Sequence, residues 1–192
     1  LFRSGVRSYA DFVAFVKAQA GKATYASAGN GSPNHVFMEE LLLKIGGSML
    51  HVPYRGGAAA VTGVLGDQAQ FMLAGIAPAL GFIQSGKLNA VAVTQGKRAS
   101  ILPDVPTIGE HIPGFALETW FGLFAPAGTP QAILQKVGTA VKDVLARPDM
   151  RDKLTQLGIA VNYETGEVMS RQIRADIARY QEVARKIKLE AN

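Results

Sequence analysis

The sequence predicts an α/β fold with a mostly parallel sheet, and three observations support this. Short apolar segments alternate with amphipathic ones between residues 23 and 94, as strands alternate with helices around parallel sheets. Glycine is abundant, with 21 residues in 192, and sixteen of them lie in residues 1–114, where turns must separate those segments. Hydrophobic residues make up 48% of the chain and charged residues 18%, which excludes wholesale disorder and coiled-coil or collagen-like repeats.

The first part of the chain is expected to open with a helix over residues 8–20, because Ser8 and Asp11 have the spacing of a capping box. Apolar and β-branched segments then predict strands over 23–26, 50–53, 70–73 and 88–94. Helices are predicted between them over 33–45, 57–65 and 78–84.

The composition changes near Pro113 and Gly114. Residues 115–192 hold only five glycines but 20 charged residues, and the proline-rich stretch 97–116 is expected to be an ordered, extended connection. Beyond it, the pattern predicts a buried strand over 117–124, a second strand over 159–163, and helices over 129–146, 148–158 and from 166 onward. In the last helix the pairs Glu182 with Lys186 and Asp176 with Arg179 are expected on the exposed side.

Several classes of protein are disfavoured by composition. The absence of Cys excludes disulfides, thiolate metal ligands and a Cys nucleophile, and His51 and His111 lack metal-type spacing, so neither a metal nor another cofactor is expected. The net charge of +5 is spread without a basic cluster, which disfavours nucleic-acid binding. No apolar run is long enough to cross a bilayer. Because the chain opens without Met or a signal-peptide run, we expect a processed or truncated piece with its export signal upstream.

Ligands of open α/β sheets bind at the carboxyl ends of strands, so the turns after the first four predicted strands are the places to search. These turns comprise residues 27–32, 54–57, 74–78 and 94–96. Arg55 is their only charged residue, and they offer no carboxylate, no His and no hydroxyl with an evident partner base. An enzymatic role is therefore not expected.

The turn over residues 27–32 suits anion binding. Gly29 and Gly31 let backbone N–H groups approach a ligand, and Ser32 and Pro33 are a typical N-cap and first residue of a helix, whose positive dipole end favours a carboxylate or a phosphate. Such a turn can equally do no more than connect strand and helix. No Walker or dinucleotide motif is present, which disfavours nucleotides.

Three other side chains allow two interpretations each. His35 follows on the first turn of that helix, where it either contacts a ligand or packs locally. Arg55 either pairs with a distal carboxylate or is a solvated loop charge, and we expect the latter. Trp120 is expected in the core, with a position at the edge of a ligand cleft as the alternative.

Five ordered motifs across nearly the whole chain resemble the Bug-type extracytoplasmic receptors of tripartite tricarboxylate transporters. The motifs are YASAGNGSPNH at 25–35, HVPYRGG at 51–57, GKLNAVAVT at 86–94, LPDVPT at 102–107 and WFGLFAPAGTP at 120–130. The resemblance implies a periplasmic-binding-protein fold of the second type, in which a small carboxylate is held between two lobes and delivered to a membrane permease. It also implies a periplasmic location.

The same resemblance implies which residues bind. The turn at 27–32 would hold a ligand carboxylate through amides and hydroxyls, and the turn at 74–78 would border the cleft. The expected substrate-binding residues are Ser27, Gly29, Asn30, Gly31, Ser32, His35, Ala74 and Gly75.

The chain departs from that family in one large respect. Family members begin with a segment of the first lobe that carries a Pro-Gly-Gly-x-x-Asp turn, and this sequence has no such motif. Residues 1–112 would then be the nearly complete ligand-binding second lobe, and residues 113–192 the returning part of the first lobe. We expect that part to leave apolar surface uncovered, favouring self-association or local disorder.

Two other functions remain open from the sequence. One is the effector-sensing domain of a transcription regulator, which reuses the same fold. The other is an enzyme on a related fold, which would need its acid or base from a segment outside residues 1–192.

Overall fold

The computed structural model of the chain describes residues 5–187. Its strands are β1 (Thr24–Ser27), β2 (Leu50–Pro53) and β3 (Phe71–Met72). Its α-helices are α1 (Tyr9–Gln19), α2 (Pro33–Ile45), α3 (Gly57–Leu65), α4 (Ile76–Gln84), α5 (Gln131–Ala146), α6 (Pro148–Gln156) and α7 (Gly166–Lys186), and a short 3-10 helix spans Ile108–Glu110.

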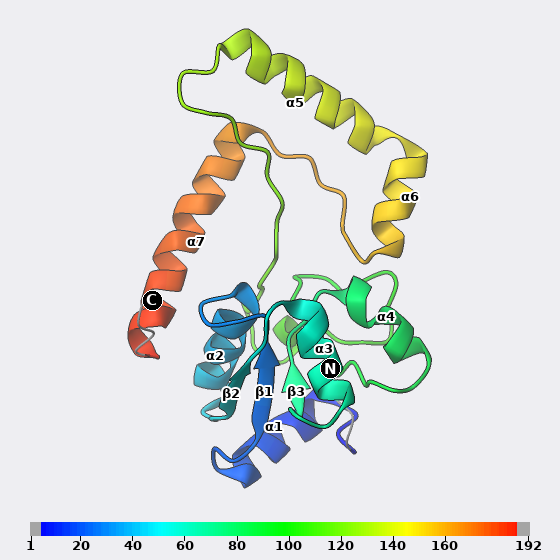
Figure 1. The fold of residues 1–192 in the computed structure, drawn as a ribbon, viewed down its shortest axis with the longest axis vertical. Helices are drawn as coiled ribbons and strands as arrows, with labels where there is room; N and C mark the ends of the chain where they lie inside the picture. Colours follow the sequence, from blue (N-terminus) through cyan, green and yellow to red (C-terminus); the bar gives the residue numbers. More distant parts are fainter. Residues whose placement is uncertain (1–4, 188–192) are drawn as a thin grey trace.

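The three strands form one parallel sheet in the order β2-β1-β3, which confirms the expected parallel α/β architecture for the first part of the chain. Successive residues of the central strand enter different cores. Tyr25 packs in the core that contains residues of α1 and α2, such as Phe12 and Leu41, whereas Ala26 packs with Val61 of α3. Helices therefore cover both faces of the sheet (Figure 1).

Two helix-start signals, at Ser8 and Ser32, act as predicted, whereas the helix expected from Thr129 begins at Gln131 with Pro130 as its N-cap. The Ser8 hydroxyl accepts a hydrogen bond from the Asp11 N–H at 3.1 Å, and the Asp11 carboxylate accepts one from the Ser8 N–H at 3.0 Å, which completes a capping box. At the start of α2, Ser32 is the N-cap and Pro33 the first helical residue.

The strand predicted over residues 88–94 does not form as a strand of the sheet. Two isolated bridge residues, Asn89 and Val93, take its place. Val93 bridges to Thr107 through hydrogen bonds from the Val93 N–H to the Pro106 carbonyl at 2.8 Å and from the Ile108 N–H to the Val93 carbonyl at 2.9 Å. Pro106 itself has no N–H to donate, so the pairing cannot extend into a regular ladder on that side.

The strands predicted over 117–124 and 159–163 are also wrong. Leu117 is buried and its N–H reaches the Thr94 carbonyl at 2.8 Å, but residues 118–124 are exposed and pair with no strand in the described part of the chain. Phe121, Leu123 and Phe124 are each more than 70% exposed. Hydrophobicity alone predicted burial here, but a strand also needs a neighbour to accept and donate its hydrogen bonds.

Helices α5, α6 and α7 form an open frame on one side of the sheet, and α7 returns to lie beside α2 (Figure 1). The Arg179 guanidinium binds the Glu40 carboxylate at 2.9 Å and donates to the Ala116 carbonyl at 3.0 Å. It therefore joins α7 to α2 and to the proline-rich connection over residues 97–116. Arg179 and Asp176 therefore do not lie on a solvated face as predicted, because they meet partners from other segments. Glu182 and Lys186 do form the expected exposed pair.

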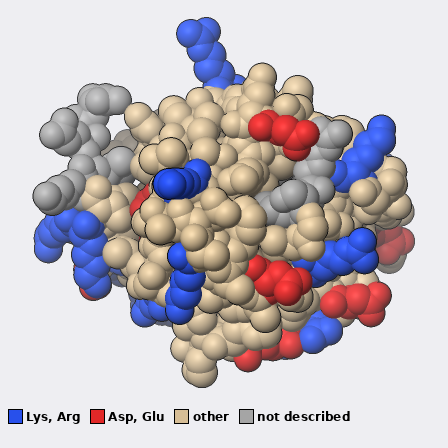
Figure 2. Space-filling model, turned by 90° about the horizontal axis from the view of Figure 1, so that it is seen from below, with Lys and Arg blue, Asp and Glu red and all other residues tan. Residues whose placement is uncertain are grey.

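On the face shown in Figure 2, Lys and Arg side chains are interspersed with Asp and Glu, and no extended patch of one sign appears. Within residues 5–187, no helix combines the length and the apolar character needed to span a bilayer.

Candidate functional site

The turns that follow β1, β2 and β3 meet at one edge of the sheet. The Gly56 N–H, after β2, donates to the Ala28 carbonyl, after β1, at 3.3 Å. The Asn34 side-chain amide, on the first turn of α2, donates to the carbonyl of Leu73, directly after β3, at 2.6 Å. The two hydrogen bonds join the three turns, so the predicted site residues of 27–32 and 74–75 lie at the same edge.

Three helices begin at this edge. The N-cap of α2 is Ser32, whose hydroxyl accepts from the His35 N–H at 3.4 Å, while α3 and α4 begin at Gly56 and Gly75 without a side-chain cap. None of these three helices, which the structure describes in full, has an acidic residue in its first turn. Their N-termini combine free N–H groups with the positive ends of three helix dipoles, which is an environment for an anion.

The turn after β1 uses some of its polar groups internally. Ser27 is completely buried, and its hydroxyl accepts from the Gly29 N–H at 3.1 Å and lies 2.6 Å from His51 Nε2. The Gly31 N–H donates to His35 Nδ1 at 3.1 Å. Gly29 and Gly31 have φ angles of 130° and 70°, in the region that favours glycine. The amides of Gly29 and Gly31 therefore shape the turn.

Other amides of the same turn are open. Among the residues described, nothing accepts a hydrogen bond from the backbone N–H of Asn30 or of Asn34. Asn30 is exposed, and Ser32 and Asn34 are partly exposed. These groups can donate to an oxyanion at the N-terminus of α2 without breaking a bond of the fold.

Two imidazole rings stack beneath this turn. The centroids of the His35 and His51 rings are 3.9 Å apart, and the ring planes are nearly parallel, with an angle of 7° between them. The Tyr25 ring stacks on His51 with a centroid distance of 4.9 Å. Burial, and secondarily the His35 ring, lower the pKa of His51 to about 4. Burial also lowers the pKa of His35, although the Glu39 carboxylate opposes this shift. Both rings are therefore neutral at neutral pH.

The structure also reveals two groups that the sequence analysis missed. Ser27 does have a partner imidazole, His51, contrary to the expectation that no hydroxyl of these turns has one. Tyr25 and Ser27 lie on the same face of β1, but the contact depends on the register that places Tyr25 opposite His51 of β2, which the sequence alone does not show. A Ser–His pair can be a nucleophile and its base, but the Ser27 hydroxyl is buried and bonded to the turn. The second missed residue is Asn34.

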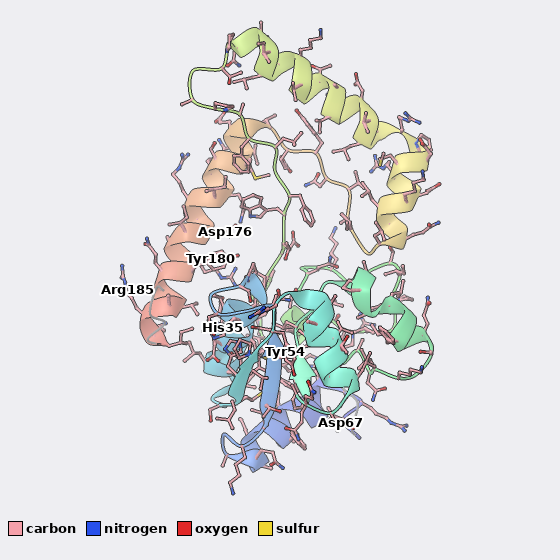
Figure 3. The ribbon with its side chains drawn as sticks, in the orientation of Figure 1. His35, Tyr54, Asp67, Asp176, Tyr180 and Arg185 are labelled. Carbon is pink, nitrogen blue, oxygen red and sulfur yellow. The ribbon has the colours of Figure 1, made fainter. Side chains whose placement is uncertain are left out.

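The remaining candidates lie as follows. Ala74 is partly exposed, Gly75 is the exposed N-cap of α4, and Arg55 is exposed, as expected for a solvated loop charge. Trp120 does not enter the core as expected: it is 36% exposed, and its indole N–H donates to the Asp176 carboxylate of α7 at 2.8 Å. Figure 3 shows His35 and Tyr54 beside the sheet, and Asp176 and Tyr180 on α7.

The C-terminal part of the chain reaches one end of this edge. Gly158, just after α6, has a φ of 72°, and a Cβ added to it would lie 2.8 Å from the Cβ of Ile76, the first residue of α4. The approach of α6 to the start of α4 therefore requires glycine at residue 158.

Comparisons with known proteins agree with this architecture. A family model described as "Tripartite tricarboxylate transporter family receptor" matches residues 3–189. A protein of Pseudomonas sp. strain P51, described as "UPF0065 protein in tcbD-tcbE intergenic region", is 33% identical over 174 residues, which cover 90% of this chain and 52% of that protein. The chain spans about half of the length of most of the curated relatives it matches.

Solved structures match over nearly the whole chain. The structure titled "R. palustris Rpa4515 with adipate" superposes with a TM-score of 0.88 at 27% identity, and covers 96% of this chain and 62% of the other. The structure titled "Structure of periplasmic binding protein BugD" has a TM-score of 0.84 at 30% identity, covering 98% of this chain and 64% of the other. The fold is therefore that of the periplasmic binding proteins, and the chain corresponds to part of one.

Proposed function

Because the chain belongs to the receptor family of tripartite tricarboxylate transporters, we propose that it binds a small organic carboxylate at the edge where β1, β2 and β3 end. One observation carries the proposal: α2, α3 and α4 all begin at this edge, and their first turns hold no acidic side chain in the described structure. A carboxylate here is stabilised by free N–H groups and by the positive dipole ends.

The residues divide into two groups in this proposal. Asn30 and Ser32, with the N–H of Asn34, hold one carboxylate, while Ser27, Gly29 and Gly31 keep the turn in shape. Ala74 and Gly75 border the ligand from the start of α4. His35 lies beneath the turn and accepts a hydrogen bond from its Gly31 N–H. The solved relative whose title names adipate supports a dicarboxylate as the ligand class. One carboxylate of such a ligand would lie at this edge, and the other would extend beyond it.

At the level of the whole protein, we propose a periplasmic receptor that passes its ligand to a membrane permease. The relative titled as a periplasmic binding protein supports the location. Residues 1–112 form the ligand-binding lobe in this proposal, and residues 113–192 form the returning segment of the other lobe. The apolar residues exposed on that segment support self-association of the 192-residue chain.

Substitutions at Ser32 test the site, with adipate as the probe and calorimetry as the measurement. Ser32→Ala removes one hydroxyl and is expected to weaken adipate binding by about 1 to 2 kcal/mol, the scale of a hydrogen bond to a charged group. Ser32→Asp keeps a good N-cap for α2 but places a carboxylate where the ligand carboxylate lies, so binding should be lost while the fold is kept.

The matched control is Ser100→Ala, which changes an exposed serine on the proline-rich connection and should leave the affinity for adipate unchanged. Circular dichroism of each variant reports whether α2 is still formed. Unchanged affinity in Ser32→Ala would remove Ser32 from the site, and wild-type affinity in Ser32→Asp would place the carboxylate elsewhere.

A further inference from the structure

The stacked rings of His35 and His51 lie beneath the turn over residues 27–32, which we call the carboxylate turn, and contact it through hydrogen bonds at two points. His35 Nδ1 accepts the Gly31 N–H at 3.1 Å, and His51 Nε2 lies 2.6 Å from the Ser27 hydroxyl. Ser27 and Gly31 stand on either side of Gly29 and Asn30, so the two rings control both ends of the segment that carries the open amide of Asn30.

We propose that His35 is a positioning residue that holds the 27–31 turn in its ligand-binding conformation through its unprotonated Nδ1, with His51 stacked on it and in contact with Ser27, and that protonation of His35 releases the turn. This inference rests on the proposed carboxylate site, because it concerns the residues that present that site. His35 therefore makes the affinity for the carboxylate dependent on pH.

The hydrogen bond at Gly31 fixes the protonation state of His35. An N–H group can only donate, so His35 Nδ1 must carry a lone pair and its proton must be on Nε2. A second proton on this ring would occupy Nδ1 and face the Gly31 N–H donor to donor. The turn would then lose the bond that orients Gly31 and, with it, the adjacent amide of Asn30.

The stack makes simultaneous protonation of the two rings unfavourable. With the ring centroids 3.9 Å apart, protonating both rings would bring two positive charges together in a partly buried site. The polar groups that face the pair are Tyr25 and Ser27 from β1 and Glu39 from α2. Of these described groups, only Glu39 favours a cation, and its carboxylate also accepts a hydrogen bond from the Tyr25 hydroxyl.

The direction of the pH effect follows from the lowered pKa of both histidines. An opened turn, in which the rings meet water, binds protons more readily than the closed turn does. The closed turn is therefore fully stable above the ordinary histidine pKa of about 6.5 and is lost as the pH falls from there toward about 4.

NMR of the 192-residue chain tests the inference without a ligand. The Gly31 amide shift should follow the titration of the His35 ring, with a midpoint below 6.5, and its hydrogen exchange should accelerate over the same range. His35→Ala should expose the Gly31 amide at every pH. His35→Asn places an acceptor near the position of Nδ1 that does not titrate, so it should keep the amide protected and remove the pH dependence.

His111→Asn is the control, since this exposed ring stacks on Tyr9 and lies outside the turn. The inference would be overturned if the Gly31 amide shift did not change as His35 titrates. It would also be overturned if the Gly31 amide of His35→Asn exchanged as fast as that of His35→Ala. The well-dispersed amides of β1 in each variant's spectrum report that the sheet is folded.

A second readout separates this inference from the proposed function. At pH 7.5, His35→Ala should weaken adipate binding at least tenfold, and His35→Asn should weaken it less. If the wild-type chain does not bind adipate while Gly31 still follows His35, the proposed function fails and the positioning role stands. If adipate binds equally well to the wild type and to His35→Ala, the positioning role fails. Comparing wild type and His35→Asn at each pH cancels the titration of adipate itself.

Discussion

Tyr54 connects three parts of the candidate site. Its ring packs so closely on Gly63 of α3 that a Cβ on this glycine would lie 2.3 Å from the ring, and its hydroxyl donates to Gln68 at 3.2 Å. Its carbonyl oxygen would be 3.5 Å from a Cβ at Gly29 of the carboxylate turn. The absence of a side chain at Gly63 thus lets α3 approach Tyr54 at the end of β2.

Gly63→Ala is therefore expected to destabilise the chain. The added methyl group must displace the Tyr54 ring, which should lower the free energy of unfolding by about 1 to 2 kcal/mol after the better helix propensity of alanine is subtracted. Gly57→Ala, at the start of the same helix, meets no atom within 4 Å and should leave stability unchanged or slightly higher. Urea unfolding measures both variants, and equal midpoints would contradict this account of Tyr54.

At the scale of elements, α5 and the segment 118–124 have their apolar side chains uncovered. Helix α5 buries none of its residues within the described structure. Its apolar face and the preceding segment expose large hydrophobic side chains, namely Phe121, Leu123, Phe124, Ile133, Leu134, Val137 and Val144. Soluble monomers rarely expose so many large apolar side chains on neighbouring elements, so these elements favour association.

The 192-residue chain should therefore self-associate in a concentration-dependent manner, as sedimentation velocity can measure. Phe124→Lys should shift the distribution toward the monomer, because a charge replaces an exposed aromatic ring in the association surface. Leu43→Lys, an equal change of charge at an exposed position on α2, should not. A chain that is monomeric at every concentration, with full amide protection over residues 117–187, would contradict this prediction.

The helices could be predicted because their signals are local. The capping box at Ser8 and the N-cap at Ser32 each lie within one turn of the helix they start. The strands over 117–124 and 159–163 could not be predicted correctly, because apolar sequence does not say whether another strand lies alongside. The same limit applies to the site. The turn at 27–32 was readable from its glycines and its N-cap, but the contact of His51 with Ser27 depends on the register between β1 and β2.

At the scale of the whole molecule, an ion pair and a close contact are among the interactions that join the C-terminal part to α2 and α4. Arg179 of α7 pairs with the largely buried Glu40 of α2, and Gly158 meets Ile76 at the start of α4. The second contact lies next to Gly75, at the edge where the carboxylate is proposed to bind. The C-terminal part thus borders the proposed site, for which the sheet with α2, α3 and α4 would supply the groups that hold the anion.

The most direct test of the carboxylate site is an NMR titration of the 192-residue chain with adipate and, in parallel, with adipamide, its neutral analogue. The account predicts that adipate shifts the amide signals of Asn30 and Asn34 downfield in a saturable manner, since these N–H groups donate to the carboxylate, and that adipamide does not. Equal shifts with both compounds, or saturable binding of adipate that leaves both amides and the N-termini of α3 and α4 unchanged, would contradict it.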